Sequence, residues 1–242
     1  MVNDLDEAVA LDTVAEIVAL GASAVACVGD VTACDFGAKF VDAAVEAFGT
    51  IDIIVNNAGY AWDSVIQKTT DEQWSAMIDV HLNAPFRLLR AAQPVLAELA
   101  KGEIAAFGAA TRRTVVNISS VAGLGGNAGQ VGYAAGKMGV VGITKTLMKE
   151  WGRYNITVNA VAFGAIMTRM TTGEAGRSTI SIKGREIKAG VGEEILAAME
   201  SGIPLGRAGT PEEAAGAVYL LCLPEADYIT GQVLVVGGGW SL

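Results

Sequence analysis

Short apolar runs alternate with longer amphipathic stretches along most of the chain. The short runs, rich in Val, Ile and Ala, predict strands at residues 24–28, 51–55, 114–118, 156–162 and 232–236. The longer stretches predict helices at residues 11–20, 33–48, 71–100, 130–151, 193–201 and 211–221. Strands that alternate with helices favour a parallel, doubly wound sheet, so we expect an α/β, Rossmann-like fold in a single domain, residues 1–242.

Two local signals refine the predicted helices. Thr210 stands three residues before Glu213, which is the arrangement of a capping box at the start of a helix. Pro85 follows His81 by four residues and has no N–H to donate to the His81 carbonyl. We therefore expect the helix at 71–100 to be kinked between His81 and Pro85, with that carbonyl available to water.

The composition fits a large buried core and argues against several classes of protein. Hydrophobic residues make up 52% of the chain, which suits a sheet covered on both faces. The net charge of −9 argues against a nucleic-acid partner, and no apolar run approaches the roughly 20 residues of a membrane span. The acidic first residues are unlike a signal or transit peptide. Cys27, Cys34 and Cys222 are scattered, as in a reduced, cytoplasmic protein, and the lone histidine leads us to expect no catalytic metal.

Three polar side chains are candidates for chemistry. Tyr133 and Lys137 are four residues apart, so a helix places them on one face, and the ammonium is expected to lower the tyrosine pKa from about 10. Ser120 ends an apolar strand and can point toward the same space. The glycines between, at 123–129, mimic a dinucleotide fingerprint, but they follow the wrong strand, so we interpret them as a flexible active-site loop.

Ser120, Tyr133 and Lys137 at this spacing resemble the short-chain dehydrogenase/reductase family. Further motifs of that family occur along the whole chain. They are Gly29-Asp30-Val31, Asn56-Asn57-Ala58-Gly59, Asn159-Ala160-Val161-Ala162, Thr168, and the tail from Gly231-Gln232 to Gly237-Gly238-Gly239. The chain is most similar to the branch with 3-oxoacyl-thioester reductases and 3-hydroxyacyl-CoA dehydrogenases.

The resemblance implies reversible hydride transfer between NAD, or NADP, and a small-molecule carbonyl or secondary alcohol. Tyr133 would protonate the carbonyl oxygen, Ser120 would hydrogen-bond it, and Lys137 would support the tyrosine. The implied catalytic residues are Ser120, Tyr133, Lys137 and His81. The implied cofactor-binding residues are Asp4, Asp30, Val31, Asn57, Ala58, Gly59, Tyr133, Lys137, Gly164, Ile166 and Thr168.

Two positions depart from the family pattern. Phe163-Gly164 stands where the family usually has Pro-Gly, so the wall beside the nicotinamide is expected to differ in shape. His81 stands where the family's fourth catalytic residue is usually Asn. A similar histidine occurs in peroxisomal-type 3-hydroxyacyl-CoA dehydrogenases, so we do not interpret it as inactivating. The alternative interpretation of His81 is a satisfied core residue.

The family's opening strand, glycine-rich turn and helix have no counterpart in these residues. Val2-Asn3-Asp4 matches the tail of the second strand, and the Asp4 carboxylate there would favour NAD over NADP. Since the first strand is central in the sheet, we expect the sheet to lack its central strand or its neighbours to close the gap. We also expect weak cofactor binding and interpret Met1 as an internal start of a longer reading frame.

Other expectations concern the lid, the assembly and the alternative functions. The polar, glycine-rich stretch at 171–192 is predicted as a loop, which is either a mobile insertion or part of a substrate lid at about 168–202. By resemblance, the long helices at 71–100 and 130–151 would pack a homo-tetramer. One alternative is a truncated, cofactor-deficient, non-catalytic oligomerising member of the family. The other is a sugar-nucleotide epimerase, against which the Asn56–Gly59 motif and the compact C-terminus argue.

Overall fold

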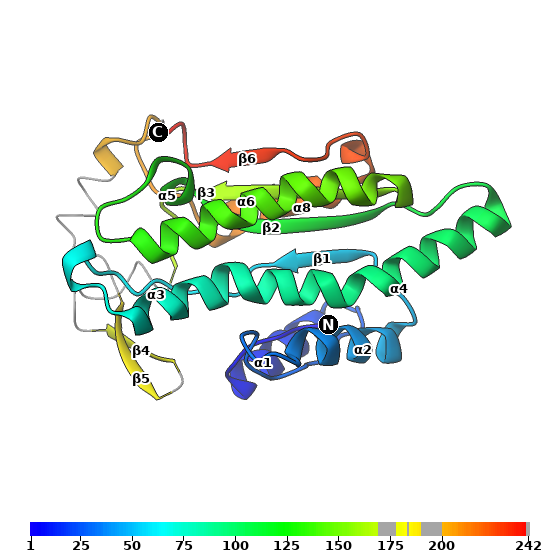
Figure 1. Ribbon diagram of the computed structural model, residues 1–242, viewed down its shortest axis with the longest axis horizontal. Coiled ribbons are helices and arrows are strands. Elements are labelled where there is room, and N and C mark those ends of the chain that lie inside the picture. Colours follow the sequence, from blue (N-terminus) through cyan, green and yellow to red (C-terminus); the bar gives the residue numbers. More distant parts are fainter. Residues whose placement is uncertain (169–177, 183, 190–199, 241–242) are drawn as a thin grey trace.

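The structure is a computed structural model, and it describes residues 1–168, 178–182, 184–189 and 200–240 (Figure 1). Its centre is a four-stranded parallel sheet in the order β1-β2-β3-β6. The strands are β1 (Ile53–Asn56), β2 (Arg113–Ser120), β3 (Ile156–Phe163) and β6 (Val233–Val236). Helices α6 and α8 both pack on β2 and β3, from opposite faces of the sheet (Figure 1). The predicted α/β, doubly wound class is therefore confirmed.

The helices lie close to the predicted ranges. They are α1 (Glu7–Ala19), α2 (Phe36–Phe48), α3 (Asp71–Ile78), α4 (Ala84–Phe107), α5 (Val121–Gly125), α6 (Val131–Trp151) and α8 (Pro211–Cys222). Helix α1 begins earlier than predicted because the Asp6 carboxylate accepts the Ala8 N–H and caps it. At α8 the predicted capping box of Thr210 and Glu213 is confirmed. The helix expected at 193–201 falls largely on residues outside the described ones. Within the described chain, no helix is both long and apolar enough to cross a membrane.

Where a kink between His81 and Pro85 was predicted, the α-helical pattern is interrupted by a π-helical turn, Asp79–Asn83, between α3 and α4. The Ala84 N–H bonds to the Asp79 carbonyl, five residues back rather than four. Pro85 lies in the first turn of α4, where its missing N–H is tolerated. The extra residue in this turn changes the direction in which the His81 side chain leaves the helix. This direction matters for the site described below.

Asparagines inside the sheet are fully paired. Asn117 on β2 is buried, accepts the Asn56 amide at 2.7 Å and donates to the Thr144 hydroxyl at 2.9 Å. Asn159 on β3 accepts the Gln232 N–H at 3.0 Å and is buried as well. Because a buried amide without partners is costly, these bonds fix the sheet's register and its contact with α6.

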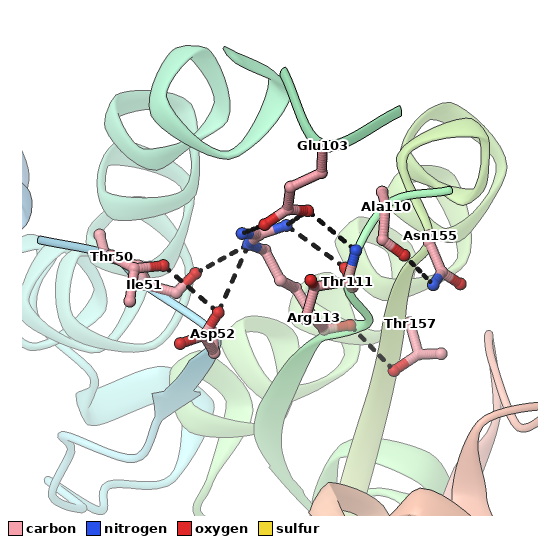
Figure 2. A network of polar contacts seen from close by, with 9 residues as sticks. All are labelled: Thr50, Ile51, Asp52, Glu103, Ala110, Thr111, Arg113, Asn155 and Thr157. Atoms are coloured by element: carbon pink, nitrogen blue, oxygen red, sulfur yellow. Dashed lines mark hydrogen bonds and ion pairs between the residues drawn. The ribbon is translucent and has the colours of Figure 1, made fainter. Parts of the chain in front are cut away.

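A second polar network ties the start of β2 to its neighbours (Figure 2). The buried Arg113 guanidinium binds both carboxylate oxygens of Glu103 on α4, at 2.9 and 2.8 Å. It also donates to the Ile51 carbonyl at 3.2 Å and lies 3.6 Å from the Asp52 carboxylate. Hydrogen bonds to Arg113 hold the Glu103 pKa at about 2. One residue of β2 thereby joins α4 to the segment that leads into β1.

Three sequence predictions are corrected by local structure. Residues 24–28 form only one isolated parallel bridge, Ala26 to Val2, instead of a strand in the main sheet. The stretch predicted as a flexible glycine loop contains the short helix α5, capped where the Ser120 hydroxyl accepts the Ala122 N–H at 3.2 Å. The polar stretch predicted as a loop contains an antiparallel hairpin, β4 (Ser178–Ile182) and β5 (Arg185–Ala189). Gly184 supports its turn with a φ of +74°.

The expected gap in the sheet is confirmed in its first form, a missing central strand. The Val2–Ala26 pair is separate from the four-stranded sheet, and the neighbours do not close on each other. A groove of about 1080 Å³ lies between them, lined by Asn3 and Asp4 on one side and β1 on the other. Met1 lines the same groove and packs against the main core.

Candidate active site

Four predicted catalytic residues meet at the carboxyl end of β2. Ser120 is the last residue of β2, Tyr133 and Lys137 lie on α6, and His81 lies in the π-turn. The Ser120 hydroxyl lies near enough to Tyr133 to lower its pKa, and it donates to the Phe163 carbonyl at 3.4 Å. The Tyr133 ring lies edge-on to the His81 ring with centroids 4.9 Å apart, and the Lys137 Nζ atom is 5.6 Å from the Tyr133 ring centroid. The structure thus brings together residues that are as many as 56 positions apart in sequence.

Lys137 is a buried cation anchored to the sheet. Its ammonium donates to the Ile118 carbonyl at 2.9 Å, and its own carbonyl accepts the Ser119 hydroxyl at 2.8 Å. Burial lowers the Lys137 pKa from 10.5 to about 8. The side chain is therefore charged at neutral pH but close to its titration range, which suits a group that passes or supports protons.

The predicted lowering of the Tyr133 pKa is wrong for this structure. Burial raises the Tyr133 pKa, while the hydrogen bond with Ser120 lowers it and the Asp63 charge raises it further. The Lys137 Nζ atom is 5.6 Å from the ring centroid and is not among the causes that shift the Tyr133 pKa, of which desolvation of the phenolate is the largest. Tyr133 is accordingly a neutral phenol at neutral pH, which is the form that donates a proton.

His81 is neutral and its tautomer is fixed. Its Nε2 atom lies 2.7 Å from the Tyr60 carbonyl, an acceptor, so Nε2 carries the proton and donates. The His81 pKa is lowered to about 3: burial is the largest cause, the Lys137 charge acts in the same direction, and the bond to Tyr60 opposes both. Its Nδ1 atom is buried and has no hydrogen-bond partner among the described residues. This lone pair is an unused acceptor beside Tyr133.

Glycines make room for this cluster. A Cβ atom on Gly59 would lie 2.4 Å from the His81 ring, and one on Gly136 would lie 2.8 Å from the His81 Cβ. A Cβ on Gly123 would meet the Lys137 Cβ at 2.8 Å. Only glycine permits these approaches, because a side chain at these positions would displace His81 or Lys137.

The predicted adenosine-side residues line the groove beside β1. Asp4, Asp30, Val31, Asn57, Ala58 and Gly59 all lie along it. The Asp30 carboxylate accepts the Thr32 N–H at 2.9 Å and its hydroxyl at 2.8 Å, and Asp4 accepts the Asp6 N–H at 2.9 Å. Both carboxylates are thus held at the groove, at the ends of the Val2 and Ala26 segments.

The predicted residues after β3 form a separate, braced segment. Gly164 donates its N–H to the Val236 carbonyl at 2.9 Å, and a Cβ on it would lie 2.7 Å from the Gly237 Cα. Ile166 pairs with Gly209 in a parallel bridge. Thr168 is exposed at the edge of the described residues. This segment follows Phe163, which pairs with Ser120 in the sheet, so it starts beside the catalytic cluster.

Sequence reasoning missed two residues near the cluster. The Tyr60 carbonyl fixes His81, and its position directly after the Asn56–Gly59 motif was the available signal. Asp63 has a raised pKa through burial, accepts the Gln130 amide at 2.8 Å, and acts on the Tyr133 hydroxyl through its charge. No motif in the sequence marks Asp63, because the contact joins positions 67 residues apart.

The site fits a nicotinamide cofactor at one end. The phenol, hydroxyl and ammonium of the cluster suit the nicotinamide and its ribose. The pyrophosphate needs a helix N-terminus with free N–H groups. The two helices that begin nearest the groove, α1 and α2, instead have the carboxylates Asp6 and Asp35 at their N-caps. Among the described residues, the starts of these two helices therefore do not favour binding of the pyrophosphate.

Comparisons with known proteins agree with the geometry. A family model described as enoyl-(acyl carrier protein) reductase matches residues 1–241. The chain belongs to the short-chain dehydrogenase/reductase family. It is therefore an oxidoreductase of the kind that transfers a hydride between a nicotinamide cofactor and a carbonyl or secondary alcohol.

Relatives of this short-chain dehydrogenase/reductase carry informative names. A 3-oxoacyl-[acyl-carrier-protein] reductase from Chlamydia muridarum is 39% identical over 212 residues, 88% of this chain and 74% of its own. Another, from Synechocystis, is 36% identical over 241 residues, 99% of this chain and 85% of its own. A solved structure, a blue fluorescent protein from a metagenomic library in complex with NADPH, matches with a TM-score of 0.80 and 26% identity over 99% of this chain and 86% of its own. These relatives lend no support to the non-catalytic alternative.

Proposed function

We propose that this chain reduces 3-oxoacyl thioesters at the cluster of Ser120, Tyr133, Lys137 and His81. The cluster carries the proposal because it brings a neutral phenol, a neighbouring hydroxyl and a buried ammonium together in one place. The relatives named 3-oxoacyl-[acyl-carrier-protein] reductase support the thioester as substrate.

Each residue has a distinct role in the proposed reaction. The Tyr133 phenol donates its proton to the substrate's carbonyl oxygen, and the Ser120 hydroxyl hydrogen-bonds the same oxygen as negative charge develops. The Lys137 ammonium stabilises the phenolate that remains. His81 is a positioning residue whose ring packs edge-on against the Tyr133 ring, and it lies in the π-turn Asp79–Asn83. A bound nicotinamide supplies the hydride.

We propose NAD as the preferred cofactor. Asp4 and Asp30 lie together along the groove, and their carboxylates would repel the 2′-phosphate of NADP. The remaining cofactor contacts are assigned to Val31, Asn57, Ala58 and Gly59 in the groove and to Gly164, Ile166 and Thr168 after β3.

We propose a substrate lid at about 168–202, of which the β4–β5 hairpin is a described part. Arg185 on β5 forms an ion pair with Glu72 on α3 at 2.5 Å, and its guanidinium lies 5.9 Å from the Trp62 ring centroid. These contacts hold the hairpin near the segment that follows the Asn56–Gly59 motif, where a thioester would enter.

We propose a homo-tetramer that packs through the exposed faces of α4 and α6. Phe86 and Met138 are both 47% exposed, and Phe107 is 83% exposed. Apolar patches of this kind on a folded chain mark contacts with other chains. Light scattering at micromolar concentration should give the mass of four chains, and a monomeric mass would refute the proposal.

The test of the proposed reaction is NADH oxidation with a panel of 3-oxoacyl thioesters, steroids and simple ketones. We expect turnover with the thioesters and a loss of about 10²- to 10⁴-fold in kcat for Tyr133→Phe, with the fold intact by circular dichroism. Tyr219→Phe is the matched control, because this substitution removes the same hydroxyl group at an exposed site on α8. A Tyr133→Phe variant with a near-native rate would overturn the assignment.

A further inference from the structure

The segment that follows β1 reaches the start of the helix that carries Tyr133. Ser64 donates its N–H to the Gly129 carbonyl at 2.8 Å and forms an isolated parallel bridge with Gln130. The Gln130 side-chain amide donates to the Asp63 carboxylate at 2.8 Å. Gln130 is the N-cap residue of α6, and Tyr133 lies in the first turn of that helix. These contacts hold the Asp63 carboxylate beside the turn that presents the catalytic phenol.

The partner of the Asp63 carboxylate is itself held in place. The Asn127 amide donates to the Gln130 side-chain oxygen at 3.0 Å, and the Asn127 carbonyl accepts the Gln130 N–H at 3.1 Å. Because Asn127 engages the amide oxygen of Gln130, the amide nitrogen is directed to Asp63. Asp63 as a whole residue is exposed, yet its carboxylate is shielded enough to raise its pKa above the ordinary value. The carboxylate therefore lies at the boundary between solvent and the catalytic cluster.

No cation pairs with this carboxylate in the part of the chain that the structure describes. Its partner Gln130 is a neutral amide, and no described lysine or arginine forms an ion pair with Asp63. The negative charge acts on Tyr133 and raises the pKa of the phenol. An anion bound against the Tyr133 hydroxyl would be repelled by the same charge.

The hydrogen bond to Gln130 does not by itself require a charge at position 63. The side-chain oxygen of an asparagine accepts the same amide. A carboxylate also has a cost here, because it disfavours the phenolate that Tyr133 becomes after it gives up its proton. What a carboxylate adds, and an amide does not, is repulsion of a second anion.

We propose that Asp63 is a specificity-determining residue that excludes 3-oxo acids with a free carboxylate and admits their neutral thioesters. This inference rests on the proposed function, in which Tyr133 protonates the 3-oxo group. A free 3-oxo acid bound in that way carries its carboxylate only two carbons from the reacting carbon, close to the Tyr133 hydroxyl on which Asp63 acts. A thioester is uncharged at the same place, so it escapes this repulsion.

The cations of this region are engaged elsewhere. The Lys137 ammonium is buried and directed to the Ile118 carbonyl at 2.9 Å. Arg185, on the neighbouring hairpin, forms its ion pair with Glu72. Because both cations already have partners, the charge of Asp63 decides which substrates the site accepts.

The first test compares kcat/KM for two probes at one fixed NADH concentration. The probes are acetoacetate and its neutral thioester with N-acetylcysteamine. Asp63→Asn keeps an acceptor for Gln130 and removes the charge, so the preference for the thioester should fall about tenfold. Asp42→Asn, which removes an exposed carboxylate on α2, should leave the preference unchanged. A preference that is kept by Asp63→Asn but lost by Asp63→Ala would assign the role to the hydrogen bond and overturn the proposal.

The second test measures binding and needs no turnover. Acetoacetate and methyl acetoacetate are titrated into the native chain and into Asp63→Asn, with the Trp62 indole signal followed by NMR. The native chain should bind the ester more tightly, and Asp63→Asn should reduce the difference about tenfold.

The two tests separate this inference from the proposed function. A native chain that discriminates between the probes in binding, but turns over no thioester, would refute the proposed reaction and support the role of Asp63. Turnover of the thioester with an unchanged preference in Asp63→Asn would overturn the role of Asp63 alone. Equal binding of the two probes by the native chain, or binding of neither, would overturn it as well.

Discussion

At the scale of single residues, His81 makes the free energy of unfolding depend on pH. Its folded pKa of about 3 lies well below its ordinary value of 6.5, so between these values the unfolded chain holds a proton that the folded chain does not. Stability is therefore complete above pH 6.5 and is lost as pH falls through that window, by up to about 1.4 kcal/mol per pH unit.

His81→Asn should remove this dependence. Urea denaturation between pH 7 and pH 4.5 should show a falling free energy of unfolding for the native chain and a flatter profile for the variant. The measurements stop at pH 4.5 because Glu103 also has a lowered pKa, of about 2. Below the ordinary glutamate pKa this group makes the free energy of unfolding fall as well. Parallel profiles for the two proteins would contradict the buried, neutral state of His81.

Two other residues show how burial set the chemistry of the site. The sequence placed Lys137 one helical turn from Tyr133 and predicted that its charge would control the tyrosine pKa. In the structure the ammonium is drawn to the Ile118 carbonyl and desolvation controls both groups. Spacing fixed which side chains share a face, but the direction of the ammonium depended on a strand 19 residues away in sequence.

At the scale of elements, the Arg113 network decides how α4 sits against the sheet (Figure 2). Glu103→Ala would leave the buried guanidinium with only the longer contact to Asp52 and its carbonyl partners. We expect a loss of about 3 kcal/mol in the free energy of unfolding. Denaturant melts would measure it, with Glu98→Ala as the control, because Glu98 is exposed on the same helix.

The double variant Glu103→Ala/Arg113→Met sharpens this prediction. It removes the buried charge along with its partner, so much of the stability should return. A Glu103→Ala variant no less stable than Glu98→Ala would show that the network contributes little to folding.

Element boundaries were predictable where the signal was local. The capping box at Thr210 and the break near Pro85 were both read from a few neighbouring residues, and both are present. The β4–β5 hairpin and the short helix α5 were missed, since polar or glycine-rich composition does not distinguish a loop from short regular structure.

At the scale of the whole molecule, the interrupted sheet predicts weak cofactor binding. The pyrophosphate of a dinucleotide binds at a helix N-terminus, and at the starts of α1 and α2 it would meet the carboxylates Asp6 and Asp35, which repel its charge. Titration by NADH fluorescence should give a dissociation constant weaker than micromolar, with NADPH weaker still because of Asp4 and Asp30. The NADPH-binding metagenomic protein is the reference, and micromolar NAD(H) binding by the 242-residue chain would contradict the prediction.

The sequence by itself determined the α/β class, the order of strands and helices, and the set of candidate residues. The class and the order of elements follow from apolar periodicity, and the candidate residues follow from motifs that resemble those of the short-chain dehydrogenase/reductase family. It also indicated the missing central strand, because the family order of strands assigns each motif a place in the sheet.

Only the tertiary structure decided what those residues can do. It placed His81 edge-on to Tyr133 in the π-turn, packed His81 against Gly59 and Gly136, and raised the Tyr133 pKa by burial. It also showed that Val2 and β1 stay apart and leave a lined groove between them. Desolvation, close approach and edge pairing depend on which segments meet in space, and the local sequence does not determine which segments meet.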